Sequence, residues 1–135
     1  MGKTSYRIEN GNFYINGKLT YSELPGSDKN VHGLLFNARF IQGVFDDKAG
    51  RERFYRFGRR FDPQENTELL LHDLPTWYEA GIRAVTVGFQ GGGPCFTIDN
   101  TTIENNPYGS DGKQMDPAYL ERMGRIIDEA DRIGM

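Results

Sequence analysis

Hydrophobic and polar positions alternate at the start of the chain in a pattern that predicts a β-hairpin. Two short runs at residues 6–9 and 13–15 are separated by Asn10-Gly11, and Asn16-Gly17 follows the second run. Asn-Gly between alternating apolar residues is a strong hairpin signal, because both positions tolerate the positive φ of the turn. We therefore assign residues 1–34 to an N-terminal β-hairpin and a turn-rich linker.

Two later segments have the character of buried strands. Residues 35–45 are mostly apolar, lack a helical period and predict a strand centred on 39–45. Residues 82–89 are rich in β-branched side chains, with bulky apolar residues on one face and small or polar residues on the other. Such a strand suits a barrel or a doubly wound sheet.

The segment between these strands predicts a helix. Its apolar positions follow the spacing i, i+4, i+7, i+8 and are Leu70, Leu74, Trp77 and Tyr78. We expect Asn66 or Thr67 to cap this helix and Gly81 to end it. Pro75 lies inside the pattern and predicts a kink or a break, because proline removes a backbone donor.

A second helix is predicted from Asp116 to Gly134, after a long loop at residues 90–115. Asp116 is a typical N-cap residue, and Pro117 fits the first helical position. The buried stripe of this helix is expected to contain Leu120, Met123, Ile126, Ile127 and Ala130.

The order hairpin, strand, helix, strand, helix predicts an α/β fold. Strands that alternate with helices pair in parallel through right-handed crossovers. Two parallel strands alone would leave two bare sheet edges, which folded domains avoid. We therefore expect residues 35–135 to form the first two βα units of a longer barrel or open sheet.

Composition and charge exclude several classes of protein. Of the 135 residues, 37% are hydrophobic and 13% aromatic, which argues against disorder. A formal charge of -3 argues against general nucleic-acid binding. The chain has neither the run of about 20 apolar residues that spans a membrane nor the apolar region of a signal peptide. The single Cys95 rules out an intramolecular disulfide and fits a reducing, cytoplasmic setting.

Neither a metal nor a cofactor is expected. His32 and His72 are far apart, and two isolated histidines are weak evidence for a metal site. A glycine-rich loop that cradles a phosphate needs a helix directly after it, but Pro94 and a long loop follow the glycines at 91–93. We expect these glycines to form a tight turn beneath a ligand-binding loop.

Polar residues at the predicted end of the first strand are candidates for ligand binding, because parallel α/β proteins place their chemistry at the carboxyl ends of strands. Asp46 and Asp47 could bind a polar ligand or a cation there, or they could be the solvated start of a turn. Neighbouring residues in a strand point to opposite faces, so these carboxylates are not expected to flank one bond as a catalytic pair. Gln42 and Asp46 share a face and are the better candidates to point inward.

Gln90 is the corresponding candidate at the end of the second strand. It continues the small, polar face of that strand, and its amide can donate and accept hydrogen bonds to hydroxyl groups. The alternative is an amide that only anchors the following loop.

Residues 51–61 interleave basic and aromatic side chains. The basic residues are Arg51, Arg53, Arg56, Arg59 and Arg60, and the aromatic residues are Phe54, Tyr55, Phe57 and Phe61. Such a pattern can bind single-stranded nucleic acid, but the negative net charge favours a connection whose aromatics pack on the fold and whose arginines pair with acids. Sugar binding is a third interpretation.

Several strings of the chain together resemble a group of cellulase-like glycoside hydrolases. They are Gln42-Gly43-Val44-Phe45-Asp46-Asp47, Leu74-Pro75-Thr76-Trp77, Gly81-Ile82-Arg83-Ala84-Val85-Thr86-Val87 and Phe89-Gln90-Gly91-Gly92. The opening Phe13-Tyr14-Ile15-Asn16-Gly17-Lys18 is similar to the hairpin that precedes many clan A glycosidase barrels. The resemblance covers about residues 36–135, and the order and spacing of its parts make it specific.

The resemblance implies a TIM (β/α)8 barrel that cleaves O-glycosidic bonds with two carboxylates. In that clan the acid/base glutamate follows an asparagine at the end of strand four, and the nucleophile ends strand seven. Both strands lie beyond the two βα units found here, so no catalytic residue is assigned. The residues implied to line the sugar-binding mouth are Gln42, Asp46, Asp47, Gln90, Gly91 and Gly92.

A carbohydrate is therefore the expected partner, without nucleic acid or membrane. The alternative function is a non-catalytic carbohydrate-binding or assembly module. Such a module would complete its sheet through the open edges, either by self-association or with a partner chain.

Overall fold

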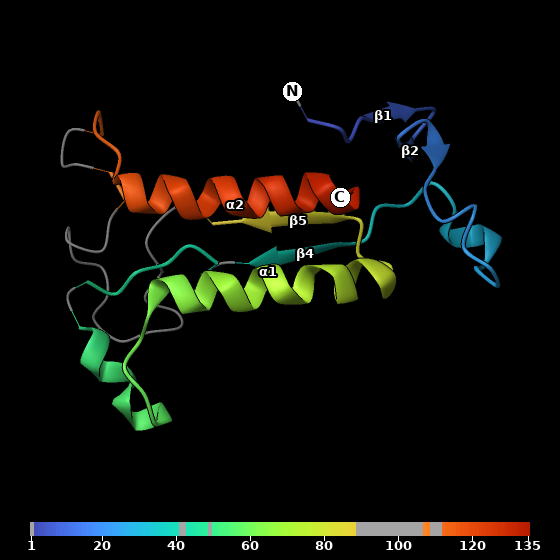
Figure 1. The fold of residues 1–135 in the computed structure, drawn as a ribbon. Helices are drawn as coiled ribbons and strands as arrows, with labels where there is room; N and C mark the ends of the chain where they lie inside the picture. Colours follow the sequence, from blue (N-terminus) through green and yellow to red (C-terminus); the bar gives the residue numbers. More distant parts are fainter. Residues whose placement is uncertain (1, 41–42, 49, 89–106, 109–111) are drawn as a thin grey trace.

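The computed structural model describes residues 2–40, 43–48, 50–88, 107–108 and 112–135, without the side chain of Arg53. Within these ranges the chain forms a mixed α/β structure with a small antiparallel sheet, a parallel strand pair and two α-helices (Figure 1). Two 3₁₀ helices, η1 at Lys29–Val31 and η2 at Arg51–Phe57, lie in the connections.

The N-terminal sheet confirms the predicted hairpin and adds a third strand. β1 (Tyr6–Glu9), β2 (Asn12–Ile15) and β3 (Lys18–Leu19) pair antiparallel in that order. Both Asn-Gly pairs have positive φ, with values of 51° and 78° at Asn10-Gly11 and 49° and 79° at Asn16-Gly17. These are the dihedral angles that tight hairpin turns require.

The second sheet confirms the predicted parallel pairing. β4 (Asn37–Phe40) pairs with β5 (Ala84–Val87), and the register places Phe40 opposite Val87. The helix α1 (Pro63–Glu79) connects the two strands, and α2 (Pro117–Ile133) follows β5 in the chain. Both strands point towards the end of the molecule where the two helices begin (Figure 1).

Both helices pack against the same face of this strand pair. The side chains of Phe40, Val85 and Val87 pack on a buried cluster formed by Val44, Leu70, Leu74, Tyr119 and Ile126. The alternate positions Asn37, Arg39 and Thr86 are exposed on the opposite face. The helical cover is therefore one-sided in the described part of the chain.

The first predicted strand is longer than the observed one. β4 ends at Phe40, and Val44 and Phe45 lie in a loop although they are 0% and 1% exposed. These residues are apolar because the loop itself is buried, so hydrophobicity alone extended the strand prediction too far. The argument that Gln42 and Asp46 share a strand face does not apply to Asp46, which lies in the loop.

Helix α1 begins earlier than predicted and is not broken. Asp62 is the N-cap, and its carboxylate accepts the Gln64 and Glu65 N–H groups, at 2.8 and 3.0 Å. The helix continues through Pro75, with Leu74 fully buried before it. Trp77 stacks on Phe40 after it, with the ring centroids 4.6 Å apart. Core contacts on both sides of Pro75 hold the helix together despite the missing donor.

Helix α2 has the predicted ends, with Asp116 as N-cap and Gly134 in the left-handed region as C-cap. Its buried face is rotated from the predicted one. Leu120 and Ile127 are 55% and 59% exposed, whereas the buried residues are Tyr119, Arg122, Ile126 and Ala130.

The N-terminal segment is tied to the end of α2 by Asp131. Its carboxylate accepts the Lys3 N–H at 2.8 Å and the Thr4 N–H at 2.6 Å, and the Thr4 hydroxyl donates to the Asp131 carbonyl at 3.0 Å. The two backbone N–H groups lower the pKa of Asp131 below its ordinary value.

This tether predicts a pH dependence of stability. Because the folded-state pKa of Asp131 is lowered, its contribution is present above the unfolded-state pKa of about 3.9 and is lost as the pH falls through the folded value. We expect Asp131→Asn to reduce the dependence of Tm on pH in this acidic range. Asp128→Asn is the control, because Asp128 is exposed on the same helix. Equal acid sensitivity of wild type and D131N would contradict the assignment.

Candidate functional site

A loop at residues 43–48, buried except for Lys48, lies where β4 and β5 end. The carboxyl ends of the two strands are adjacent, since the Gly88 N–H donates to the Phe40 carbonyl at 3.0 Å. The N-termini of α1 and α2 lie at this same end (Figure 1). This edge is where parallel α/β proteins bind their ligands, so the loop is the candidate site.

Asp46 forms a bidentate ion pair with Arg51. The guanidinium donates to the two carboxylate oxygens at 2.9 and 2.7 Å. The Asp46 side chain is 4% exposed and that of Arg51 is 34% exposed. The hydrogen bond to Asp46 raises the pKa of Arg51 above its ordinary value. Through this pair the Asp46 carboxylate fixes the loop against the start of η2.

The backbone of the loop is held by side chains from both helices. The Tyr119 hydroxyl accepts the Asp46 N–H and donates to the Asp46 carbonyl, each at 3.0 Å. Arg122 donates to the Val44 carbonyl at 3.2 and 3.0 Å, and Thr67 donates to the Gly43 carbonyl at 2.9 Å. These bonds satisfy backbone groups that burial would otherwise leave without partners.

Burial raises the pKa of Tyr119 to about 12. Its hydroxyl therefore remains protonated near neutral pH and keeps the donor that the Asp46 carbonyl accepts. The Tyr119 ring also lies 5.5 Å from Lys48 Nζ, measured to the ring centroid. The loop thus contacts the first turn of α2 through both the hydroxyl and the ring of Tyr119.

Lys48 links the loop to the N-terminus of α2 by an ion pair with Asp116. Burial raises the pKa of Asp116, but the hydrogen bonds from Lys48 and from the Ala118 N–H outweigh this effect and hold the pKa below its ordinary value. The negative charge is also favourable at a helix N-terminus. Asp116 therefore caps the helix and fixes the loop at the same time.

Replacement of Thr67 by valine tests the contact between α1 and the loop. The change is nearly isosteric and removes the donor to the buried Gly43 carbonyl. We expect a loss of about 1–3 kcal/mol in the free energy of unfolding, measured by urea denaturation. Thr76→Val is the control, because Thr76 is exposed on the same helix. A cost no larger for T67V than for T76V would show that this bond does not hold the loop.

The structure places two of the six predicted sugar-contacting residues. Asp46 and Asp47 are 3% and 0% exposed, so the alternative of a solvated turn is wrong. The other four, Gln42, Gln90, Gly91 and Gly92, lie outside the described residues.

Sequence reasoning missed the residues that hold the loop from the helices. Tyr119 and Arg122 were not expected to be buried, and Thr67 was expected only as a possible cap. A signal existed on α2, because Tyr119, Arg122, Ile126 and Ala130 also follow helical spacing. That stripe contains an arginine, so its apolar character is weaker than that of the stripe that includes Leu120, Met123 and Ile127.

The basic and aromatic segment forms η2 and its exit. Phe61 packs on Phe45 of the loop and on Phe54, with ring centroids 5.7 and 4.6 Å apart. Arg51 pairs with Asp46 and Arg59 pairs with Glu65. These contacts agree with the interpretation of a connection that packs on the fold and pairs its arginines with acids.

Among the described residues, no three His, Cys, Asp or Glu side chains are grouped closely enough to hold a metal ion. The helices in the described ranges are also too short or too polar to cross a membrane. Compared with protein-family models, with curated proteins and with solved structures, the chain gives no match.

Proposed function

We propose that this chain forms the first two βα units of a TIM (β/α)8 barrel of a glycoside hydrolase, with its loop at 43–48 in the rim that binds the sugar. The observation that carries the proposal is the position of this loop. It is buried, held by both helices and placed at the carboxyl edge of a parallel strand pair. Rims of (β/α)8 barrels that bind substrate are built from loops at this edge.

The one-sided cover of the strand pair supports a barrel. In a (β/α)8 barrel the helices lie outside, and the other face of each strand lines the interior. Phe40, Val85 and Val87 contact the helical side, while Arg39 and Thr86 lie on the open side. An open sheet wound in one direction has the same local arrangement, so the choice of a barrel rests on the sequence resemblance.

The reaction proposed for the complete enzyme is hydrolysis of an O-glycosidic bond by two carboxylates, one acting as the general acid. The resemblance assigns them to strands four and seven. Neither part is assigned to Asp46, which follows the first strand and pairs with Arg51. On sequence grounds, Gln42, Gln90, Gly91 and Gly92 remain the proposed sugar contacts, with Asp47 beside them.

The coding sequence that follows the codon for Met135 tests this proposal. We expect it to encode an apolar strand soon after α2, and further on an Asn-Glu pair at the end of a later strand. A following sequence without an apolar strand and without Asn-Glu would overturn the proposal.

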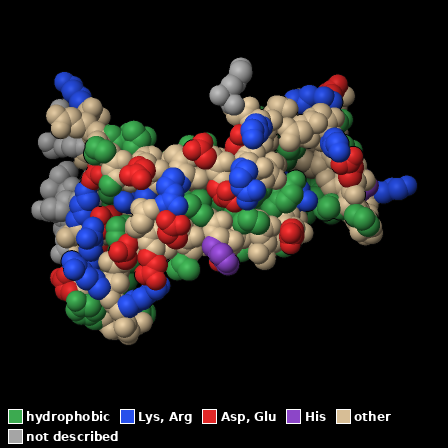
Figure 2. Space-filling model, viewed as in Figure 1, with side chains coloured by type: hydrophobic (Ala, Val, Ile, Leu, Met, Phe, Trp, Pro, Cys, Tyr) green, Lys and Arg blue, Asp and Glu red, His purple; other side chains and the backbone are tan. Residues whose placement is uncertain are grey.

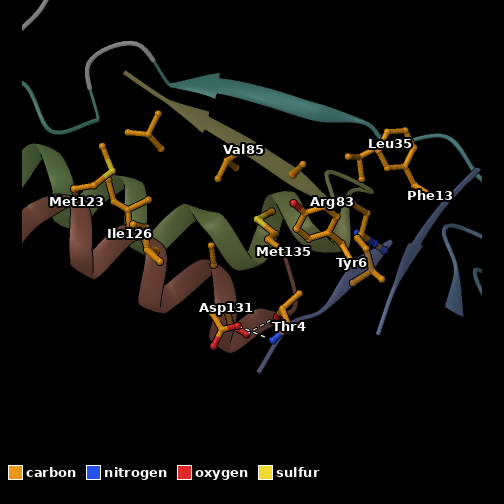
Figure 3. A pocket seen from close by; sticks show the side chains of 15 residues that line it. Thr4, Tyr6, Phe13, Leu35, Arg83, Val85, Met123, Ile126, Asp131 and Met135 are labelled. Atoms are coloured by element: carbon orange, nitrogen blue, oxygen red, sulfur yellow. Dashed lines mark hydrogen bonds between the residues drawn. The ribbon is translucent and has the colours of Figure 1, made fainter. Parts of the chain in front are cut away.

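The second candidate is an assembly or carbohydrate-binding module that completes its sheet with another chain. Within the described residues β4 and β5 pair only with each other, which leaves an open edge on each strand and favours this candidate. An apolar cavity of about 560 Å³ also lies between the N-terminal sheet, β5 and α2. Tyr6, Val85, Ile126 and Met135 line this cavity (Figure 3). Size-exclusion chromatography with light scattering is the test. Self-association would support this candidate, and a stable folded monomer would defeat it.

A further inference from the structure

A second hollow lies between η2 and the first turn of α1. Its volume is about 360 Å³, and it is lined by Phe54, Phe57, Arg59, Phe61, Asp62, Glu65 and Asn66. Three aromatic rings therefore meet four polar side chains in one small depression. Figure 2 shows hydrophobic side chains at the surface of this end of the molecule, with charged side chains around them.

The aromatic wall of the hollow is anchored in the core. Phe45 is 1% exposed and contacts Phe61, Phe61 contacts Phe54, and Phe54 contacts Phe57 with 6.3 Å between ring centroids. Phe57, the last of the series, is 67% exposed, and the Arg56 guanidinium lies over its ring at 4.7 Å from the centroid. A phenyl ring that is held by such a series and still faces solvent offers a flat apolar surface to a ligand.

The polar wall offers both donors and acceptors. Arg59 donates to Glu65 at 2.7 Å, and this is its one hydrogen bond within the described residues. A guanidinium carries five N–H donors, so the others can reach a ligand. Asp62 and Glu65 also line the hollow, and their carboxylates are hydrogen-bond acceptors. Asp62 and Glu65 are balanced by Arg59 and by Arg56 over the Phe57 ring, so the hollow favours a neutral ligand over an anion.

A flat apolar wall beside paired donors and acceptors matches the chemistry of a pyranose ring. The C–H face of the sugar packs against an aromatic ring, and its hydroxyl groups both donate and accept hydrogen bonds at the edge. We propose that this hollow binds one pyranose unit of a neutral oligosaccharide, with the sugar face on Phe57 and the hydroxyls on Arg59 and Glu65. The ligand class rests on the proposed function.

The hollow belongs to the same end of the molecule as the loop at 43–48. Phe45 of that loop is the first ring of the aromatic series, and Arg51, which pairs with Asp46, begins η2. A sugar in the hollow would therefore extend binding outward from the candidate site. This geometry favours an oligosaccharide over a single sugar.

Calorimetric titration of the full chain with cellohexaose, xylohexaose and mannohexaose tests this inference. We expect at least one of these probes to bind and Phe57→Ala to weaken that binding by about tenfold or more. Arg59→Gln should weaken it as well, which covers the case that F57A perturbs η2. Tyr55→Ala is the matched control, because Tyr55 is an aromatic residue of η2 that is 61% exposed and lies outside the lining of the hollow.

Three outcomes would overturn the inference. The first is that none of the three probes binds. The second is that a probe binds equally well to the wild type, F57A and R59Q. The third is that no sugar binds, while a single-stranded oligonucleotide binds in a salt-dependent way and F57A abolishes that binding. The proposed function fails separately. If sugar binding depends on Phe57 but the sequence after Met135 lacks the strand and the Asn-Glu pair, the sugar-binding hollow is supported and the glycoside hydrolase proposal is contradicted.

Discussion

Replacing Arg51 with methionine should destabilise the protein by about 3–5 kcal/mol, because it leaves the Asp46 carboxylate buried without its partner. Asp46 is 3% exposed, and both of its oxygens accept hydrogen bonds from Arg51. Methionine keeps much of the side-chain volume of arginine, so the loss of stability measures mainly the effect of the unpaired Asp46 charge. The free energy of unfolding is measured by urea denaturation followed by circular dichroism.

The double variant D46N/R51M separates charge from packing. Removing the carboxylate removes the unpaired charge, so the double variant should be more stable than R51M alone. Arg132→Met is the control, because Arg132 also makes a bidentate pair, with Glu129, but its side chain is 61% exposed. We expect the control to cost about 1 kcal/mol or less. Equal costs for R51M and R132M would show that burial does not strengthen the pair.

Replacing Leu74 with alanine should cost about 2–5 kcal/mol, the range found for large-to-small changes in a packed core. Leu74 is 0% exposed and belongs to the cluster that joins both helices to the strand pair. Its loss would leave a cavity beside Pro75, where the helix already lacks a backbone hydrogen bond. Urea denaturation measures the change.

Leu69→Ala is the matched control for this prediction. Leu69 lies on the same helix and is 49% exposed, so its truncation removes far less buried surface. We expect L69A to be close to wild type in stability. If L74A were no more destabilised than L69A, the cluster around Leu74 would not be the core of the described fold.

Local signals were sufficient to predict the N-terminal hairpin and the ends of the second helix. Asn10-Gly11, Asn16-Gly17 and Asp116-Pro117 each act through the backbone angles or caps of their own segment. The parallel pairing of β4 and β5 followed from the order of elements. These features need little information from distant parts of the chain.

Features that depend on distant contacts were predicted poorly. Val44 is buried against both helices and Phe45 packs on Phe61, and a strand with the same residues would look identical in sequence. Arg122 is buried because its guanidinium reaches the Val44 carbonyl, 78 residues away in the chain. Such a bond cannot be predicted from the pattern of hydrophobic residues.

The sequence predicts where the candidate site lies but not the interactions that its residues make. Asp46 and Asp47 do lie at the carboxyl edge of the strand pair, as the rule for parallel sheets indicates. The pairing of Asp46 with Arg51 could have been anticipated from their spacing of five residues, but the sequence does not show which acid a given arginine meets. The ion pair shows that Asp46 positions the loop, and its role as a sugar contact stays a prediction.

The most direct test of the central proposal is an aryl-glycoside and cellohexaose hydrolysis assay. It compares this 135-residue chain with the protein encoded by the whole open reading frame that contains it. We predict no turnover by the chain, because the two catalytic carboxylates are expected on later strands and Asp46 at the site is paired with Arg51. We predict hydrolysis by the longer protein. Turnover by the chain itself, or an open reading frame whose product hydrolyses neither substrate, would contradict the account.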